Sequence, residues 1–315
     1  MSSSRKSLAE LLDEIERLVL ANQMKEASDL VEQLLRFKPK NIELLNFKAG
    51  ILAAQNQHQE ALAVLDDIIK IDPTFAEIYS NRGKALYHLG QYKAALASFD
   101  RAIKLNATFA PAYSGKAASL RMLNRLKEAS WCSDQALRFN PLDSLAFYEK
   151  GKVLQLRERY AEAIEAFAQV IKLEPENAQA CYDQAWCYAA CKQHENAIAA
   201  YDQAIQRDPT FEAAYHNKGT SLFILERVTD ALEAFEQALQ LDPMDSFAHN
   251  AKALALVALH RYEEALAAID QAILLAPNNE SMYRNKAGIL QNLNRKDEAQ
   301  YYSHNAKKLA RSRMN

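Results

Sequence analysis

Residues 79–106 read YSNRGKALYHLGQYKAALASFDRAIKLN, and this stretch decides the fold. Apolar side chains recur at helical spacing in 76–89 and again in 92–105, and Gly90 interrupts the pattern between them. No part of the chain alternates apolar and polar residues over a length useful for a strand. The sequence therefore predicts an all-α protein, with two helices joined here by a turn at Gly90.

The same pattern recurs along the chain with a period of 34 residues. Seven of the eight prolines follow this period, and Ala107 fills the one vacant place: Pro39, Pro73, Pro141, Pro175, Pro209, Pro243 and Pro277. An alanine column keeps the period without a gap: Ala27, Ala61, Ala95, Ala129, Ala163, Ala197, Ala231, Ala265 and Ala299. Such a period indicates a stacked array, in which no single repeat can bury its apolar face alone.

A second column of small residues lies in the middle of the first helix of each repeat: Ala49, Gly83, Ala117, Gly151, Ala185, Gly219, Ala253 and Ala287. Glycine weakens a helix, so a compensating contact is expected at these places. Small side chains in both columns allow the two helices of a repeat to approach closely. A larger side chain there would cost about 1–3 kcal/mol through overpacking.

The columns in 79–106 resemble those of a tetratricopeptide repeat, with its aromatic, Gly/Ala, Leu, Ala, Phe, Ala and Pro positions. The resemblance covers about residues 8–313. It implies a right-handed superhelical solenoid of about nine 34-residue helix-turn-helix repeats, whose first helices line a concave groove. It also implies a general use in binding proteins, and it names no partner.

The two ends depart from the pattern, as expected where a solenoid meets water. Ile15 occupies the small column, and Ser303 replaces the usual Phe. The expected division is as follows: an N-terminal extension (1–7), a degenerate capping repeat (8–41), seven tetratricopeptide repeats (42–279), and a last repeat with a capping helix and basic tail (280–315). The tail carries Lys307, Lys308, Arg311 and Arg313, which we interpret as a solvated helix end rather than a binding patch.

Composition argues against several classes of partner. The chain has 38 Lys and Arg against 40 Asp and Glu, a net charge of −2 without the basic excess of a nucleic-acid or anionic-membrane protein. The longest apolar run, 253–259, is too short for membrane insertion. Residues 1–20 lack an apolar leader, and four cysteines suit a reducing compartment. We expect a cytoplasmic protein, with non-classical secretion left open.

No catalytic motif is present: there is no Gly-rich phosphate loop, HExxH, CxxC or GxSxG. Cys187, Cys191 and His194 are spaced to share a helical face, as metal ligands would. The equivalent positions of other repeats hold aliphatic residues or tyrosine, so we interpret all three as packing residues. The sequence predicts a non-enzymatic protein with no cofactor and no metal site.

The resemblance implies that the fifth, ninth and twelfth residues of each repeat face the groove. The candidate partner-binding residues in these rows are Lys84, Arg121, Tyr148, Lys152, Tyr182, Trp186, His216, Phe223, Asn250 and Leu254. From residue 42 onward the rows hold basic residues but no Asp or Glu, which favours an acidic partner segment, although Glu149 and Asp183 in the next row could offset this. Trp186 is the strongest anchor candidate, because no packing column requires Trp there.

The leading hypothesis is a scaffold or adaptor that binds a partner peptide or helix in its groove. One alternative is a co-chaperone that binds an acidic C-terminal peptide. Members of the family that do so carry a Lys and Asn at the fifth and ninth residues of one repeat, and no repeat here has that pair. Another alternative is a structural solenoid that associates with a second copy of itself.

Overall fold

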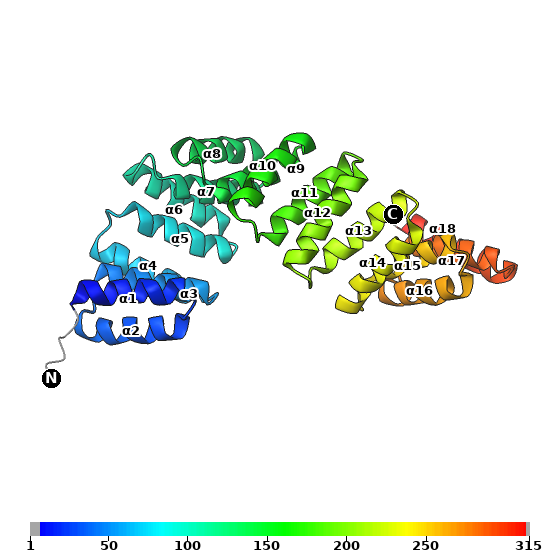
Figure 1. The fold of residues 1–315 in the computed structure, drawn as a ribbon, viewed down its shortest axis with the longest axis horizontal. Coiled ribbons are helices and arrows are strands. Elements are labelled where there is room, and N and C mark those ends of the chain that lie inside the picture. Colours follow the sequence, from blue (N-terminus) through cyan, green and yellow to red (C-terminus); the bar gives the residue numbers. More distant parts are fainter. Residues whose placement is uncertain (1–6, 313–315) are drawn as a thin grey trace. The chain divides into compact units, whose positions relative to one another are not determined.

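The computed structural model describes residues 7–312, which form eighteen α-helices and no strand (Figure 1). The first helices of the nine repeats are α1 (Leu8–Leu20), α3 (Ile42–Ala54), α5 (Ala76–His88), α7 (Ala110–Met122), α9 (Ser144–Leu156), α11 (Ala178–Ala190), α13 (Glu212–Ile224), α15 (Ser246–Ala258) and α17 (Glu280–Asn292). The second helices are α2 (Met24–Phe37), α4 (His58–Ile71), α6 (Tyr92–Leu105), α8 (Leu126–Phe139), α10 (Tyr160–Leu173), α12 (His194–Arg207), α14 (Val228–Leu241), α16 (Tyr262–Leu275) and α18 (Lys296–Ser312).

The chain forms two compact units, Met1–Arg157 with α1 to α9 and Glu158–Asn315 with α10 to α18. Within each unit, a helix packs against the next one along the chain, and neighbouring first helices also touch, as α5 touches α7 and α13 touches α15. The all-α helical repeat solenoid predicted from the sequence is confirmed. Most of the expected N-terminal extension (1–6), and Arg313 of the basic tail, lie outside the described residues.

The turn inside each repeat has the same geometry throughout. Gly90 adopts a left-handed backbone conformation (φ 72°), its N–H donates to the Tyr87 carbonyl, and the Gln91 N–H donates to the Leu86 carbonyl. This pairing closes the first helix with a Schellman motif. The same left-handed position recurs in the other repeats: Asn22, Asn56, Asn124, Glu158, Lys192, Glu226, His260 and Asn294. The turn predicted at Gly90 is confirmed. Four of the other positions hold a residue other than the usual Gly or Asn: Glu158, Lys192, Glu226 and His260.

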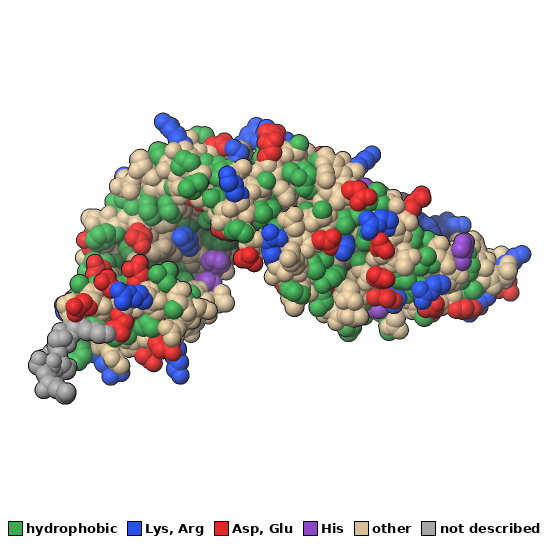
Figure 2. Space-filling model, viewed as in Figure 1, with side chains coloured by type: hydrophobic (Ala, Val, Ile, Leu, Met, Phe, Trp, Pro, Cys, Tyr) green, Lys and Arg blue, Asp and Glu red, His purple; other side chains and the backbone are tan. Residues whose placement is uncertain are grey.

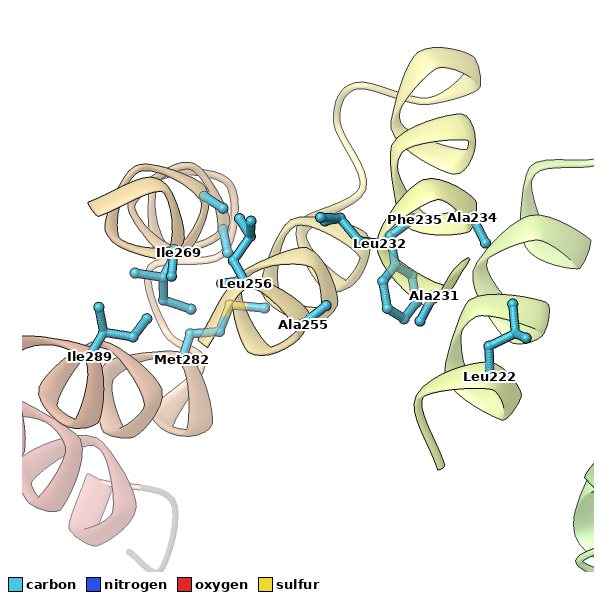
Figure 3. Close-up of a cluster of buried hydrophobic side chains, with 14 of the residues drawn as sticks. Leu222, Ala231, Leu232, Ala234, Phe235, Ala255, Leu256, Ile269, Met282 and Ile289 are labelled. Atoms are coloured by element: carbon cyan, nitrogen blue, oxygen red, sulfur yellow. The ribbon is translucent and has the colours of Figure 1, made fainter. Parts of the chain in front are cut away.

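Both small columns lie in the core. Ala27, Ala95 and Ala163 of the alanine column are fully buried, and in the second column Ala117 and Ala253 are fully buried as well. Figure 3 shows how one such alanine, Ala231, lies beside Phe235 of α14 in a cluster of buried side chains in the C-terminal unit. The columns therefore mark helix contacts, as the sequence predicts.

Three of the glycines lie against a phenylalanine ring. A Cβ on Gly83 of α5 would lie 2.7 Å from the Phe99 ring, and one on Gly115 of α7 would lie 2.4 Å from the same ring. Phe99 is fully buried, so its ring lies between the backbones of two successive first helices. Phe235 packs in the same way on Gly219, where a Cβ would lie 2.7 Å away. The contact of Phe99 with Gly115 thus joins one repeat to the next, whereas Gly83–Phe99 and Gly219–Phe235 are contacts within a repeat.

Replacing one of these glycines should destabilise the stack. We expect Gly115→Ala to lower the free energy of unfolding by about 1–3 kcal/mol, because the buried Phe99 ring has no room to move aside. Gly50 of α3 is the matched control, since a Cβ there meets nothing within 4 Å. Gly50→Ala should instead stabilise by about 0.5–1 kcal/mol through helix propensity. Urea unfolding followed by circular dichroism measures both; equal stabilisation by the two substitutions would contradict the packing described.

Candidate partner-binding surface

The predicted binding residues are divided between the two compact units. Lys84, Arg121, Tyr148 and Lys152 lie in the N-terminal unit. The others lie in the C-terminal unit: Tyr182, Trp186, His216, Phe223, Asn250 and Leu254. Figure 2 shows acidic and basic side chains interspersed over the visible face of both units.

Trp186 is the most exposed aromatic residue of the predicted set. It lies on α11 with 38% of its surface exposed, and its ring packs edge-on against Tyr160 at 5.7 Å between ring centroids. This contact holds one side of the indole while the rest of the ring faces solvent. A large, pre-positioned aromatic surface of this kind suits an interface anchor. Leu254 stands in the same row on α15 and is half-buried.

Tyr182 packs between repeats. Its ring lies against Phe211 at 4.7 Å and Tyr201 at 5.8 Å, and its hydroxyl accepts a hydrogen bond from Asn217 at 2.8 Å. Burial raises the pKa of Tyr182. Phe223 of α13 is also part of the packing, since it contacts the main apolar cluster of the C-terminal unit. Tyr182 and Phe223 therefore expose less surface to a partner than their positions in the repeat predict.

Asparagines of the sixth row join adjacent first helices. Asn217 donates to Tyr182, and Asn285 donates to the side-chain carbonyl of Asn250 at 2.8 Å. In the N-terminal unit Asn81 donates to Asn46 at 3.3 Å. Each donor lies 35 residues after its acceptor. The constant spacing of 35 residues is the sequence signal of this contact.

Arg121 is engaged by an acidic neighbour. Its Nε and Nη2 atoms donate to the two carboxylate oxygens of Glu149, at 2.6 Å and 3.2 Å, and so link α7 to α9. The Glu149 side chain is 3% exposed and that of Arg121 15%. Lys84 remains exposed on α5, and Lys152 is half-buried on α9. Glu149 therefore compensates the positive charge of Arg121, one of the basic residues predicted to face a partner.

A groove lies on the first helices of the three N-terminal repeats. It has a volume of about 610 Å³ and is lined by residues of α1, α3 and α5. Its apolar lining residues are Leu12, Val19, Phe47 and Ile51. Its acidic lining residues, all exposed, are Asp13, Glu16, Glu43 and Glu77. We call this surface the acidic groove. The predicted binding positions are the fifth, ninth and twelfth residues of each repeat from residue 42 onward. Asp13 and Glu16 precede residue 42, and Glu43 and Glu77 are the second residues of their repeats, so all four carboxylates were missed.

The cysteines are packing residues. Cys132, Cys181 and Cys187 are buried, and burial raises the pKa of the Cys132 thiol to about 11, far from a reactive thiolate. Among the described residues, the group with metal-ligand geometry is not the Cys187, Cys191 and His194 set but a cluster of Glu212, His216 and Asp245.

The His216 cluster lies within the C-terminal unit. The Nδ1 atom of His216 is 3.5 Å from Oδ2 of Asp245, and its ring packs edge-on against Phe235. Burial lowers the pKa of His216, which the nearby Asp245 opposes. Burial also raises the pKa of Glu212, and the charges of Asp245 and Asp242 add to this. His216 thus interacts mainly with acidic neighbours of its own unit.

Matches to family models decide the classification. Models described as tetratricopeptide repeat match residues 47–125, 148–210 and 250–303, which together are more than half of the chain. The chain belongs to the tetratricopeptide repeat family. Residues 190–272 of the tetratricopeptide array also match a model described as anaphase-promoting complex, cyclosome, subunit 3. No curated protein matches the chain significantly.

Solved structures share the fold. The anaphase-promoting complex heterotetramer Cut9–Hcn1 aligns with a TM-score of 0.67 and 17% identity, over 92% of this chain and 57% of that one. The chain therefore spans little more than half of the length of that relative. YrrB, described as a tetratricopeptide repeat protein with an unusual peptide-binding site, aligns at 0.51 and 25% identity, over 60% of this chain and 97% of its own. MamA from Desulfovibrio magneticus RS-1 aligns at 0.50 and 22% identity, over 54% and 96%.

These relatives support a general role. Tetratricopeptide repeat proteins bind protein or peptide partners and are generally non-enzymatic, which supports a protein-interaction scaffold. Across residues 7–312, no helix combines the length and apolar character needed to cross a bilayer.

The buried pair of Arg121 and Glu149 should be important for stability. We expect Glu149→Gln to destabilise by about 3–5 kcal/mol, because it leaves the guanidinium without its counter-charge inside the stack. Replacing both residues by Met should cost much less, since no unpaired charge remains. The exposed pair Arg125 and Glu128 is the control, and Glu128→Gln should leave the unfolding midpoint unchanged. Thermal unfolding compares all three variants; a Glu149→Gln variant as stable as the parent chain would show that the pair contributes nothing.

Proposed function

We propose that the chain is a scaffold that binds an extended or helical segment of another protein on its first-helix faces, with the acidic groove as a main binding site. The observation that carries this is the groove itself, a concave surface of about 610 Å³ with apolar and charged lining on three successive first helices. The description of YrrB as a protein with a peptide-binding site gives the proposal further support.

The charge of the groove favours a basic partner segment. Among residues 7–312, four exposed carboxylates line it and no Lys or Arg does, so Lys or Arg side chains of a partner would meet a complementary field. Leu12, Val19 and Phe47 provide apolar surface between these charges. The acidic segment favoured by the basic rows has less support, because Arg121 is already paired with Glu149. The exposed Lys84 can still attract an acidic partner segment elsewhere in the N-terminal unit.

A display library of random peptides, selected on the immobilised full chain, tests the proposal. Enriched peptides should combine basic and apolar residues. The double substitution Glu16→Gln with Glu43→Gln should weaken their binding by about tenfold or more, since each lost charge pair removes attraction at the groove.

The matched control neutralises two acids on the second helices of the same two repeats. Glu26→Gln with Glu60→Gln removes the same charge from exposed positions on α2 and α4. This variant should bind the selected peptides as the parent chain does. Selection of acidic peptides, or equal binding by both double variants, would contradict the acidic groove as the site.

Trp186 is proposed as an anchor of a second contact, in the C-terminal unit. Among selected peptides that do not depend on Glu16 and Glu43, we expect Trp186→Ala to reduce affinity by roughly 30-fold, the loss typical of an interface anchor of about 2 kcal/mol. Trp131→Ala is the control, because Trp131 is 55% exposed but lies on the second helix α8. Fluorescence anisotropy of labelled peptides gives both affinities. Equal losses, or no loss in either variant, would remove Trp186 from the binding surface.

A further inference from the structure

Three side chains that can bind a metal meet where two repeats adjoin in the C-terminal unit. Glu212 is the first residue of α13, and His216 follows four residues later, so both lie on one face of that helix. Asp245 is the N-cap of the neighbouring first helix, α15. One ligand atom from each residue lies within 4.8 Å of the other two.

Two of these ligand atoms are buried without a hydrogen-bond partner. They are Oε1 of Glu212 and Nδ1 of His216. The other oxygen of Asp245, Oδ1, accepts the Phe247 backbone N–H at 2.8 Å, which leaves Oδ2 directed to His216 at 3.5 Å. Buried polar atoms are rarely left unpaired, because the loss of water costs about 1–3 kcal/mol for each. A cation bound between the three residues is one group that would satisfy both atoms.

Equivalent positions in two other repeats are satisfied by the protein. At the fifth row, the Ser114 hydroxyl donates to Asp143, the N-cap that corresponds to Asp245, at 2.6 Å. At the first row, Glu280 pairs with Arg284, which corresponds to His216. In repeat 212–245 these positions are occupied by Glu212, His216 and Asp245. No hydroxyl like that of Ser114 and no guanidinium like that of Arg284 stands at the His216 position. A cation between the three would replace those missing partners.

We propose that Glu212, His216 and Asp245 bind one divalent transition-metal ion such as Zn²⁺. An imidazole with two carboxylates suits zinc, whereas calcium and magnesium prefer oxygen ligands alone. Zinc bonds of about 2.0–2.1 Å in a tetrahedron place ligand atoms roughly 3.4 Å apart, close to the observed 3.5 Å between Nδ1 of His216 and Oδ2 of Asp245. Three protein ligands leave the fourth position to water. The ion would link α13 to α15.

The sequence predicts no metal site, and the reason is clear from the fold. Glu212 and His216 alone are an ordinary helical pair, and Asp245 joins them only because the next repeat stacks on α13. The proposal is independent of the proposed partner binding, since it concerns contacts inside the chain.

Zinc titration of the full chain, without a histidine tag, tests the site. Isothermal calorimetry should show one Zn²⁺ per chain, and added Zn²⁺ should raise the unfolding temperature. Glu212→Gln with Asp245→Asn should lower the zinc affinity at least about tenfold and abolish the temperature shift, since both anionic ligands are lost. Asn still caps α15, because its side-chain carbonyl can accept the same N–H.

The matched control makes the same two substitutions at the equivalent positions of other repeats, Glu280→Gln with Asp143→Asn. This variant should bind Zn²⁺ like the parent chain. Co²⁺ gives a second readout, and visible d–d bands without a thiolate charge-transfer band are expected. His216→Asn is a second site variant, and circular dichroism verifies that each variant is folded. No saturable zinc binding by the parent chain, equal binding by the two double variants, or a thiolate band would overturn the proposal.

Discussion

The contact between a phenylalanine ring and the bare backbone of two glycines is the constraint on which the N-terminal unit depends. Phe99 of α6 touches Gly83 of its own repeat and Gly115 of the next. A side chain at either glycine would overlap the ring, so the ring fixes how closely α5 and α7 approach it. In the C-terminal unit Phe235 makes the contact within a repeat, with Gly219. Side-chain size at Gly83 and Gly115 therefore sets the spacing of α5 and α7.

That spacing determines what the first helices can present. Once α7 and α9 are adjacent, Arg121 reaches Glu149, and once α11 and α13 are adjacent, Asn217 reaches Tyr182. These contacts use the hydrogen-bonding groups of Arg121 and Tyr182, two of the residues predicted to bind a partner. The acidic groove and exposed residues such as Trp186 are not taken up by these contacts. The proposed binding surface therefore consists of side chains that inter-repeat packing leaves exposed.

The sequence predicted the fold well because a fixed period places equivalent residues in equivalent surroundings. The helix expected over 76–89 is observed over 76–88, and the one expected over 92–105 is observed with those bounds. The site was harder to predict, because its contacts cross between rows of different repeats. Arg121, the twelfth residue of its repeat, meets Glu149, the sixth residue of the next, and His216 meets Asp245, the N-cap of the next first helix. Neither contact can be predicted from the residues found at a single position of the repeat.

The most direct measurement of this account is the set of nuclear Overhauser effects from the Phe99 ring protons in the full chain. Selective labelling of phenylalanine and glycine makes the relevant protons distinguishable. We expect cross-peaks from the Phe99 ring to the α-protons of both Gly83 and Gly115. A ring that shows contacts to Gly83 but none to Gly115 would mean that the repeats do not stack through this residue, and would contradict the claim.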